Sequence, residues 1–230
     1  MIETRAEFNK RISEIDLYFN TLSIFDKGKC TIQCKTIDDQ ILEQDIDEEL
    51  TRILKANGFL LLYNLIESTT RKSIGAIFNA MHTESITFKQ LTLDLRKLWF
   101  NQKVIDLKEG TFRVDTLKKM LHELADVILN NELLHFKAEC VNISGNIDAR
   151  ELRDIATKFG FTQSPNGEEL LTVKDKRNKL AHGEMTFTEI GRDYSIGDLI
   201  TFKDKTYIYL QDVLANIDTY INESKYKAEP

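Results

Sequence analysis

Residues 56–68 read ANGFLLLYNLIES and lie inside the longest periodic segment of the chain, residues 47–81. Apolar residues at helical spacing form one stripe along this segment. The stripe consists of Phe59, Leu62, Tyr63, Ile66, Ile74 and Ile77. Leu60, Leu61 and Leu65 add apolar cover on other faces. A helix that is apolar nearly all round is expected at the centre of a bundle or at a subunit interface.

Working outward from this segment, the same periodicity predicts further helices on both sides. Asp148 is a good N-cap for one of them, and Gly160 a good end. The chain has only two prolines, ten glycines and no Pro/Gly/Ser-rich linker. We therefore predict a single helical domain over residues 1–230, all-α, with the architecture of an up-and-down helical bundle. The other predicted helices span residues 3–25, 88–104 (as one or two helices), 115–130, 148–160, 168–182 and 196–226.

A few minor extended segments interrupt this helical pattern. Residues 30–37 alternate as a strand does, so they form either a hairpin arm or a plain connection. Residues 136–143 alternate weakly, and residues 185–194 are predicted to be extended, with Gly191 turning the chain. Residues 222–230 are predicted to fray, as chain ends commonly do. Trp99, the only tryptophan, is expected to pack in the core rather than to stack on a base.

Composition narrows the class of protein. The formal net charge of −6 argues against a general nucleic-acid coat protein, although a nuclease needs a positive surface only at its cleft. Three cysteines, no signal peptide and no long apolar run predict a cytoplasmic protein with no membrane association. Cys30, Cys34 and Cys140 show no ligand-like pairing with the histidines, so we expect no metal and no cofactor.

The stretch most informative about function is residues 177–182, which read RNKLAH and are followed by Gly183. It places a permanent cation, Arg177, and a side chain that titrates near neutral pH, His182, at the end of one predicted helix. A guanidinium and an imidazole together are able to cleave RNA without a metal. The alternative is a purely structural role, in which Arg177 forms an ion pair and His182 caps the helix or is solvated.

Helical geometry sharpens this interpretation. Leu170, Val173, Leu180 and Ala181 share one face of the predicted helix, and Arg177 falls in the middle of it. His182 points about 140° away in an unbroken helix, so the two side chains converge only if the helix ends there or the arginine reaches round. Gly183 is a suitable stop because glycine readily adopts the left-handed conformation that ends helices. The helix dipole favours the imidazolium at this end.

Other polar residues are candidates to support the pair. Asn57, Asn64 and Arg71 recur every seven residues along the central helix, with Glu67 beside them. Glu67 is a natural acceptor for Arg177, and Asn64 is suited to bind a phosphate or the backbone of residues 177–182. The alternative is a structural polar layer that fixes helix register. Lys174, Lys176 and Lys179 form a basic run that suits RNA, or else simply a solvated helix face.

Two stretches carry a resemblance to a known family. Residues 177–182 are similar to the motif of the HEPN superfamily, an arginine followed by four to six residues and a histidine, and Asn178 fits the polar residue common after the arginine. Residues 56–68 resemble the long early helix of a bacterial subfamily of HEPN-like nucleases found near defence genes. Residues 83–115 and 136–147 match nothing in this pattern and are interpreted as family-specific insertions.

The resemblance implies a helical bundle that forms a homodimer, with both Arg177–His182 pairs in one cleft. It further implies a metal-independent ribonuclease, often a toxin or antiviral effector, which raises the prospect of an antitoxin or other regulatory protein as a partner. RNA is the expected substrate, with His182 as general base and acid and Arg177 stabilising the phosphate. The alternative is an inactive dimeric module that binds a nucleotide, RNA or a protein through Arg177.

Overall fold

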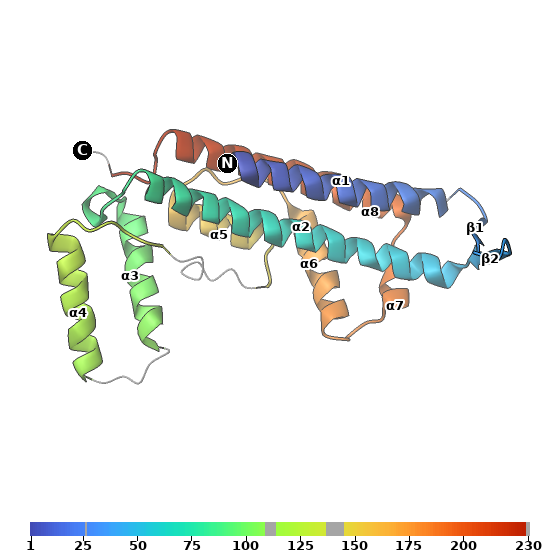
Figure 1. Ribbon diagram of the computed structural model, residues 1–230, viewed down its shortest axis with the longest axis horizontal. Helices are drawn as coiled ribbons and strands as arrows, with labels where there is room; N and C mark the ends of the chain where they lie inside the picture. Colours follow the sequence, from blue (N-terminus) through green and yellow to red (C-terminus); the bar gives the residue numbers. More distant parts are fainter. Residues whose placement is uncertain (26, 109–113, 137–144, 229–230) are drawn as a thin grey trace. The chain divides into compact units, whose positions relative to one another are not determined.

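The computed structural model describes residues 1–25, 27–108, 114–136 and 145–228. Over these residues the chain is built from helices and one small β-hairpin (Figure 1). All-α architecture is confirmed, with the hairpin as the minor extended part. The elements are α1 (Ile2–Phe25), β1 (Cys30–Lys35), β2 (Ile41–Ile46), α2 (Glu48–Thr83), η1 (Phe88–Gln90), α3 (Leu93–Lys108), α4 (Val114–Leu129), α5 (Ala149–Phe159), α6 (Glu168–Ala181), α7 (Phe187–Arg192) and α8 (Ile196–Asn222).

The chain divides into two compact units. The first, which we call the motif unit, comprises Arg5–Glu67 and Asn166–Leu210 and contains residues 177–182. The second, the distal unit, comprises Met1–Thr4, Ser68–Pro165 and Gln211–Pro230. Helices α2 and α8 contribute residues to both units, and each unit is described below by itself.

The motif unit is an up-and-down arrangement of helices. Arg11 of α1 donates to Asn64 of α2, and Tyr18 of α1 donates to the carbonyl of Leu54, so α1 and α2 run antiparallel. The ammonium of Lys203 on α8 lies 2.8 Å from a carboxylate oxygen of Asp16 on α1. The core of the unit contains buried side chains from all the long helices, which agrees with the first of the two places expected for α2, the centre of a bundle. These include Phe8, Ile15, Phe19, Leu22, Ala56, Phe59, Leu62, Leu65, Ile66, Leu170, Val173, Leu199 and Leu210.

Strands β1 and β2 pair antiparallel and form a two-stranded sheet. The alternation predicted over residues 30–37 therefore belongs to a hairpin arm and not to a plain connection. Nearly every residue of the two strands is exposed to solvent.

The distal unit contains α3, α4 and α5 together with the ends of α2 and α8. Trp99 is buried against Phe88 and Phe100, as predicted. Asp148 caps α5 by accepting hydrogen bonds from the backbone of Arg150 and Glu151, and Gly160 ends the helix in the left-handed region (φ 87°). Both ends of α5 are thus where the sequence predicted them. The weakly alternating stretch 136–143 lies outside the described residues apart from Phe136.

The predicted fraying of residues 222–230 is wrong for the described part of this tail. Tyr226 is fully buried, and its carbonyl accepts a hydrogen bond from the backbone of Thr92 (3.0 Å). Ala228 donates to the carbonyl of Gln90 (2.8 Å). The tail is held because it pairs with the segment before α3, a tertiary partner that a terminal position does not reveal.

A search of the described helices for a stretch long and apolar enough to cross a membrane found none.

Candidate functional site

Helix α6 carries residues 177–181, and its start is fixed by charge and burial. Glu168 and Glu169 occupy the first turn, where the helix dipole favours negative charge. Leu170 and Val173 are buried in the core of the motif unit. Leu180 is only half-buried and Ala181 is exposed, so the predicted apolar face holds for the first half of the helix alone. The apolar face stops short because Ala181 is the last residue of α6, and this end of the helix lies in solvent.

The C-terminus of α6 has the glycine-terminated geometry that the sequence predicted. Gly183 adopts a left-handed conformation (φ 68°). Its backbone donates to the carbonyl of Leu180 (3.2 Å), and that of Glu184 donates to the carbonyl of Lys179 (2.9 Å). These two bonds are the Schellman pattern, which satisfies the last carbonyls of a helix. His182 is the C-cap residue of this turn, and it is exposed.

Arg177 is held on three sides by residues of α2 and α6. Its guanidinium carbon lies 4.1 Å from the centre of the Tyr63 ring. One terminal nitrogen, Nη1, donates to Oδ1 of Asn178 (2.9 Å), and the other, Nη2, lies 3.8 Å from Oε2 of Glu67. Its side chain remains 27% exposed, so it is still accessible to a ligand from solvent.

The Tyr63 ring is the contact that sequence reasoning missed. Tyr63 is buried and therefore presents a fixed flat surface to the guanidinium. A cation that stacks on an aromatic face is attracted to it and keeps its N–H groups pointing outward in the guanidinium plane. The signal was available, because Tyr63 lies four residues before Glu67 and so on the same side of α2. Glu67, in contrast, was predicted as the acceptor for Arg177, and the contact is present.

Arg177 and His182 lie five residues apart, and the helix ends between them. Regular helix stops at Ala181, and His182 has φ −91° and ψ −1°. The first of the two conditions for convergence, a helix end at this point, is therefore met. The imidazole is exposed to solvent at the C-terminus of the helix.

The remaining predicted residues differ in their surroundings. Asn64 accepts a hydrogen bond from Nη1 of Arg11 on α1 (3.1 Å), so its amide oxygen faces α1. Lys174 lies 3.8 Å from Asp175, with most of its side chain covered. The ammonium of Lys176 lies 5.2 Å from the centre of the Tyr194 ring, and Lys179 is half-buried. The basic run is thus partly packed against the motif unit rather than freely solvated.

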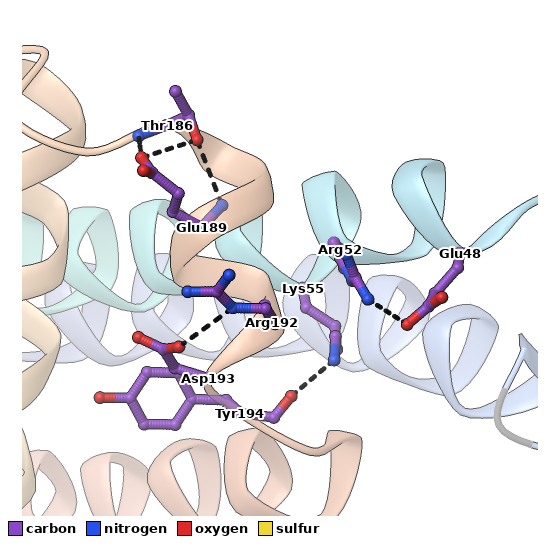
Figure 2. A network of polar contacts seen from close by, with 8 residues as sticks. All are labelled: Glu48, Arg52, Lys55, Thr186, Glu189, Arg192, Asp193 and Tyr194. Carbon is purple, nitrogen blue, oxygen red and sulfur yellow. Dashed lines mark hydrogen bonds and ion pairs between the residues drawn. The ribbon is translucent and has the colours of Figure 1, made fainter.

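Helix α7 follows the His182 turn and corrects a prediction. Residues 185–194 were expected to be extended, but residues 187–192 form a helix. Its start is a capping box, in which the Thr186 hydroxyl accepts from the backbone of Glu189 and the Glu189 carboxylate accepts from the backbone of Thr186 (Figure 2). The hydrogen bonds from Thr186 hold the pKa of Glu189 below its ordinary value.

Gly191 was expected to turn the chain, and instead it lies inside α7 and packs against α2. A Cβ atom at this position would lie 1.9 Å from the carbonyl oxygen of Arg52. Only glycine permits this approach of the two backbones. Next to it, Lys55 of α2 donates to the carbonyl of Tyr194 (2.6 Å), as Figure 2 shows. The segment that follows His182 is therefore anchored on α2.

Within the described part of the chain, no group of three or more His, Cys, Asp or Glu side chains is arranged to hold a metal ion. The chemistry available at residues 177–182 is that of a guanidinium, an imidazole and their amide and carboxylate neighbours. Such groups bind phosphate and transfer protons.

Comparison with known families agrees with this architecture. The model of one family, the MAE_28990-like HEPN family, matches residues 3–226. The chain belongs to the HEPN superfamily. HEPN domains are helical, are often ribonucleases, and commonly dimerise and bind RNA. The match covers nearly the whole chain, including α2, α6 and α7. No curated protein and no solved structure shows a significant match.

Proposed function

We propose that this HEPN protein is a metal-independent endoribonuclease of the toxin or antiviral-effector type. The observation that carries the proposal is the placement of Arg177, whose guanidinium is stacked on Tyr63 at 4.1 Å and remains partly open to solvent. The exposed His182 follows at the end of the same helix. This pairs a fixed cation for phosphate with a group able to transfer protons near neutral pH.

In the proposed reaction His182 takes the proton from a ribose 2′-hydroxyl. The 2′-oxygen attacks the adjacent phosphorus, and the bond from phosphorus to the 5′-oxygen breaks. Arg177 stabilises the negative charge that develops on the non-bridging phosphate oxygens, for which a planar pair of N–H donors is well suited. Glu67, Asn178 and the Tyr63 ring keep that donor plane oriented, whereas the amide oxygen of Asn64 accepts a hydrogen bond from Arg11.

The leaving 5′-oxygen needs a proton, and one imidazole does not serve both ends of the reaction in a single step. We infer that His182 of a second copy supplies it, in a cleft shared by a homodimer. The products are a 2′,3′-cyclic phosphate and a 5′-hydroxyl. DNA lacks the attacking hydroxyl and is not cleaved.

The lysines of α6 are proposed to contact the RNA backbone beside the reacting phosphate. Lys174, Lys176 and Lys179 surround Arg177 in sequence, and each keeps part of its surface open. The net charge of −6 gives weak long-range attraction to nucleic acid, so we expect a structured or positioned RNA rather than any strand. A toxin of this kind requires a neutralising protein or other regulator in the cell that makes it.

The test is RNA cleavage in the presence of a metal chelator. The wild type is expected to produce cyclic-phosphate ends, and His182→Ala to lower the rate by about 10²–10⁴-fold, the range for loss of a general acid or base. The matched control is His122→Ala, which removes another exposed histidine, on α4 of the distal unit. Equal cleavage by wild type and His182→Ala, or no cleavage of diverse RNAs, refutes the proposal.

A second function is favoured by one specific contact. The carboxylate of Glu67 lies beside Arg177, where it competes with a phosphate for the same guanidinium. A module that binds RNA, a nucleotide or a protein without turnover is consistent with such a resting contact. RNA binding that survives His182→Ala, is lost in Arg177→Ala and never leads to cleavage identifies this module.

A further inference from the structure

Helix α4 of the distal unit is amphipathic, yet none of its residues is buried. It lies beside α3 (Figure 1), and a groove of about 310 Å³ remains open between the two helices. Residues of α3, of α4 and of the segment just after α4 line this groove. An amphipathic helix is normally covered by another element along its apolar side. The groove is therefore a place where the distal unit has room for a partner.

The walls of the groove are apolar. Met120, Leu124 and Val127 contribute to them from two turns of α4. Trp99 contributes from α3, and its ring is buried and packs against two phenylalanines. Lys103 follows one turn later, and its ammonium lies 5.7 Å from the centre of the Trp99 ring. The groove thus combines apolar walls with an aromatic ring that already attracts one cation.

Three carboxylates also line the groove. Glu123 and Asp126 belong to α4, and Glu132 follows the end of that helix. Asn131 adopts a left-handed conformation (φ 52°), and the backbone of Glu132 donates to the carbonyl of Val127 (3.0 Å). This bond is of the type that closes a helix C-terminus, and it turns the chain back toward α4. Glu132 is therefore held beside the groove by the local backbone.

The cations near the groove are fewer than the carboxylates. Lys103 is the one cation among the described residues that line it. Lys119 lies outside the lining, 4.0 Å from Glu123, and 80% of its side chain is exposed, so solvent screens the pair. Asp126 and Glu132 form no ion pair with any residue in the described part of the chain. The groove therefore keeps negative charge available for a ligand.

We propose that this groove binds an arginine side chain that a partner protein presents between apolar residues. The aliphatic stem of the arginine lies along the apolar walls, and its guanidinium reaches Asp126 and Glu132. A carboxylate binds a guanidinium through two parallel N–H···O bonds, a geometry that lysine lacks. The volume of about 310 Å³ lies at the lower limit for small-molecule pockets and suits one long side chain with an apolar neighbour.

The charges also select the source of the arginine. Free arginine carries its own carboxylate, which the carboxylates of the groove repel, whereas an arginine inside a polypeptide does not. Phosphates of nucleic acid are repelled for the same reason. Lys118 and His122 do not change this balance, because helical geometry places them about 140–180° away from Val127 around α4. A protein segment with an arginine between apolar residues complements both the walls and the carboxylates.

An NMR titration of the full chain with a peptide tests the proposal. Trp99 is the only tryptophan of the chain, so its indole N–H gives a single resonance from the groove. The probe is a short acetylated and amidated peptide that carries one arginine between two leucines. In the matched control peptide, citrulline replaces the arginine and keeps its shape without its charge. We expect a saturable shift with the arginine peptide and a dissociation constant at least about tenfold higher for the citrulline peptide.

Variants of the carboxylates locate the bound guanidinium. Asp126→Asn and Glu132→Gln are each expected to raise the dissociation constant of the arginine peptide by about threefold or more, because each removes a charged acceptor. The matched control is Asp115→Asn, which removes a carboxylate from the first turn of α4, outside the groove, and should change it by less than about twofold. Circular dichroism checks that all three variants keep their helices.

Several outcomes would overturn the proposal. Equal affinity for the two peptides, or an affinity that Asp126→Asn and Glu132→Gln leave unchanged, would exclude recognition of the guanidinium. The absence of any shift at millimolar peptide would exclude binding in the groove. Free arginine bound as tightly as the peptide would assign the groove to a small molecule instead of a protein. Because Arg177 and His182 belong to the motif unit, none of these results depends on the proposed nuclease activity.

Discussion

Helices α5 and α6 both end at a glycine with positive φ, Gly160 and Gly183, yet they are held in different ways. Five of the eleven residues of α5 are buried, including Phe159 at its last turn. Only two of the fourteen residues of α6 are buried, and both belong to its first two turns. The end of α5 is fixed by core packing, whereas the second half of α6 is positioned by the stacking of Arg177 on Tyr63 and by ionic contacts.

The difference shows how one type of helix ending serves two purposes. Packing holds α5 because its last side chains leave solvent entirely. Aromatic and ionic contacts hold the end of α6 while its guanidinium and imidazole keep access to solvent, which a reactive site requires. Variants matched between the two helices separate stability from activity.

Truncation of the buried end of α5 is expected to give the largest effect on stability. Phe159→Ala removes a ring that packs against Phe78 (5.7 Å between centroids), and we expect the free energy of unfolding to fall by about 3–5 kcal/mol. Leu171→Ala on α6, at a 49% exposed side chain, is expected to change it by less than about 0.5 kcal/mol. Urea denaturation followed by circular dichroism measures both. Equal losses for the two variants would contradict the contrast between the helices.

Removal of the aromatic platform tests what holds the second half of α6. Tyr63→Leu keeps an apolar side chain but loses the ring face, and we expect kcat for RNA cleavage to fall by about tenfold, equivalent to about 1.4 kcal/mol. Tyr63→Phe keeps the ring, so its kcat should stay within about threefold of the wild type. Single-turnover rates at saturating RNA separate kcat from binding. A Phe variant as slow as the Leu variant would assign the effect to the hydroxyl instead of the ring.

The two terminal glycines allow the most direct comparison. Gly160→Ala and Gly183→Ala both force a Cβ into the left-handed region, so each should lower the free energy of unfolding by about 1–2 kcal/mol. Only Gly183→Ala adjoins His182, so only this variant is expected to slow RNA cleavage. Thermal unfolding and a cleavage assay on the same samples compare the two. Loss of cleavage in Gly160→Ala would mean that general destabilisation explains both results.

The smallest effect concerns an ionic contact at the start of α6. Burial raises the pKa of Glu169, but the hydrogen bond and charge of Lys205 lower it by more, so its pKa lies below the ordinary carboxylate value. The stabilisation is therefore present above about pH 4.3, the usual value for a glutamate, and is lost as the pH falls through the depressed pKa. Lys205→Ala should lower the free energy of unfolding slightly at pH 7, and by less as the pH approaches 3. Urea titrations at several pH values measure the loss of unfolding free energy, with Lys118→Ala, at an exposed lysine, as the control. A loss that does not depend on pH would argue against an ionic origin.

Local signals in the sequence were enough to predict α5 and the end of α6. Asp148 and Gly160 bracket α5 because capping depends on neighbouring backbone groups alone. Gly183 ended α6 for the same reason. The contact between Glu67 and Arg177 was also predictable, since the spacing of polar residues placed Glu67 on the side of α2 that needed a cation. The functional roles assigned to these residues remain predictions.

What escaped prediction depends on partners distant in sequence. Tyr63 was interpreted as one more apolar residue of the central stripe, although it lies four residues before Glu67 and therefore on the side of α2 that contacts Arg177. Tyr226 looked like part of a loose end because its hydrogen-bond partner, Thr92, is remote. For α7 a local signal was present, the Thr186 and Glu189 capping pattern, but the helix is too short to show a period. Gly191 was interpreted as a turn because the backbone that requires a glycine there, that of Arg52, is remote in sequence.

The packing of α7 against α2 restricts the movement of the segment that follows His182. Residues 183–186 alone connect the histidine to α7, whose Gly191 lies so close to α2 that a Cβ atom there would be 1.9 Å from the Arg52 carbonyl oxygen. A larger side chain at position 191 would displace α7 from α2. Residues 183–186 are too few to absorb a large displacement, so they would move with α7. A substitution nine positions after His182 would thus shift the imidazole. Position 191 is therefore a site at which the proposed RNA cleavage could be weakened while Arg177, Tyr63 and His182 all stay intact.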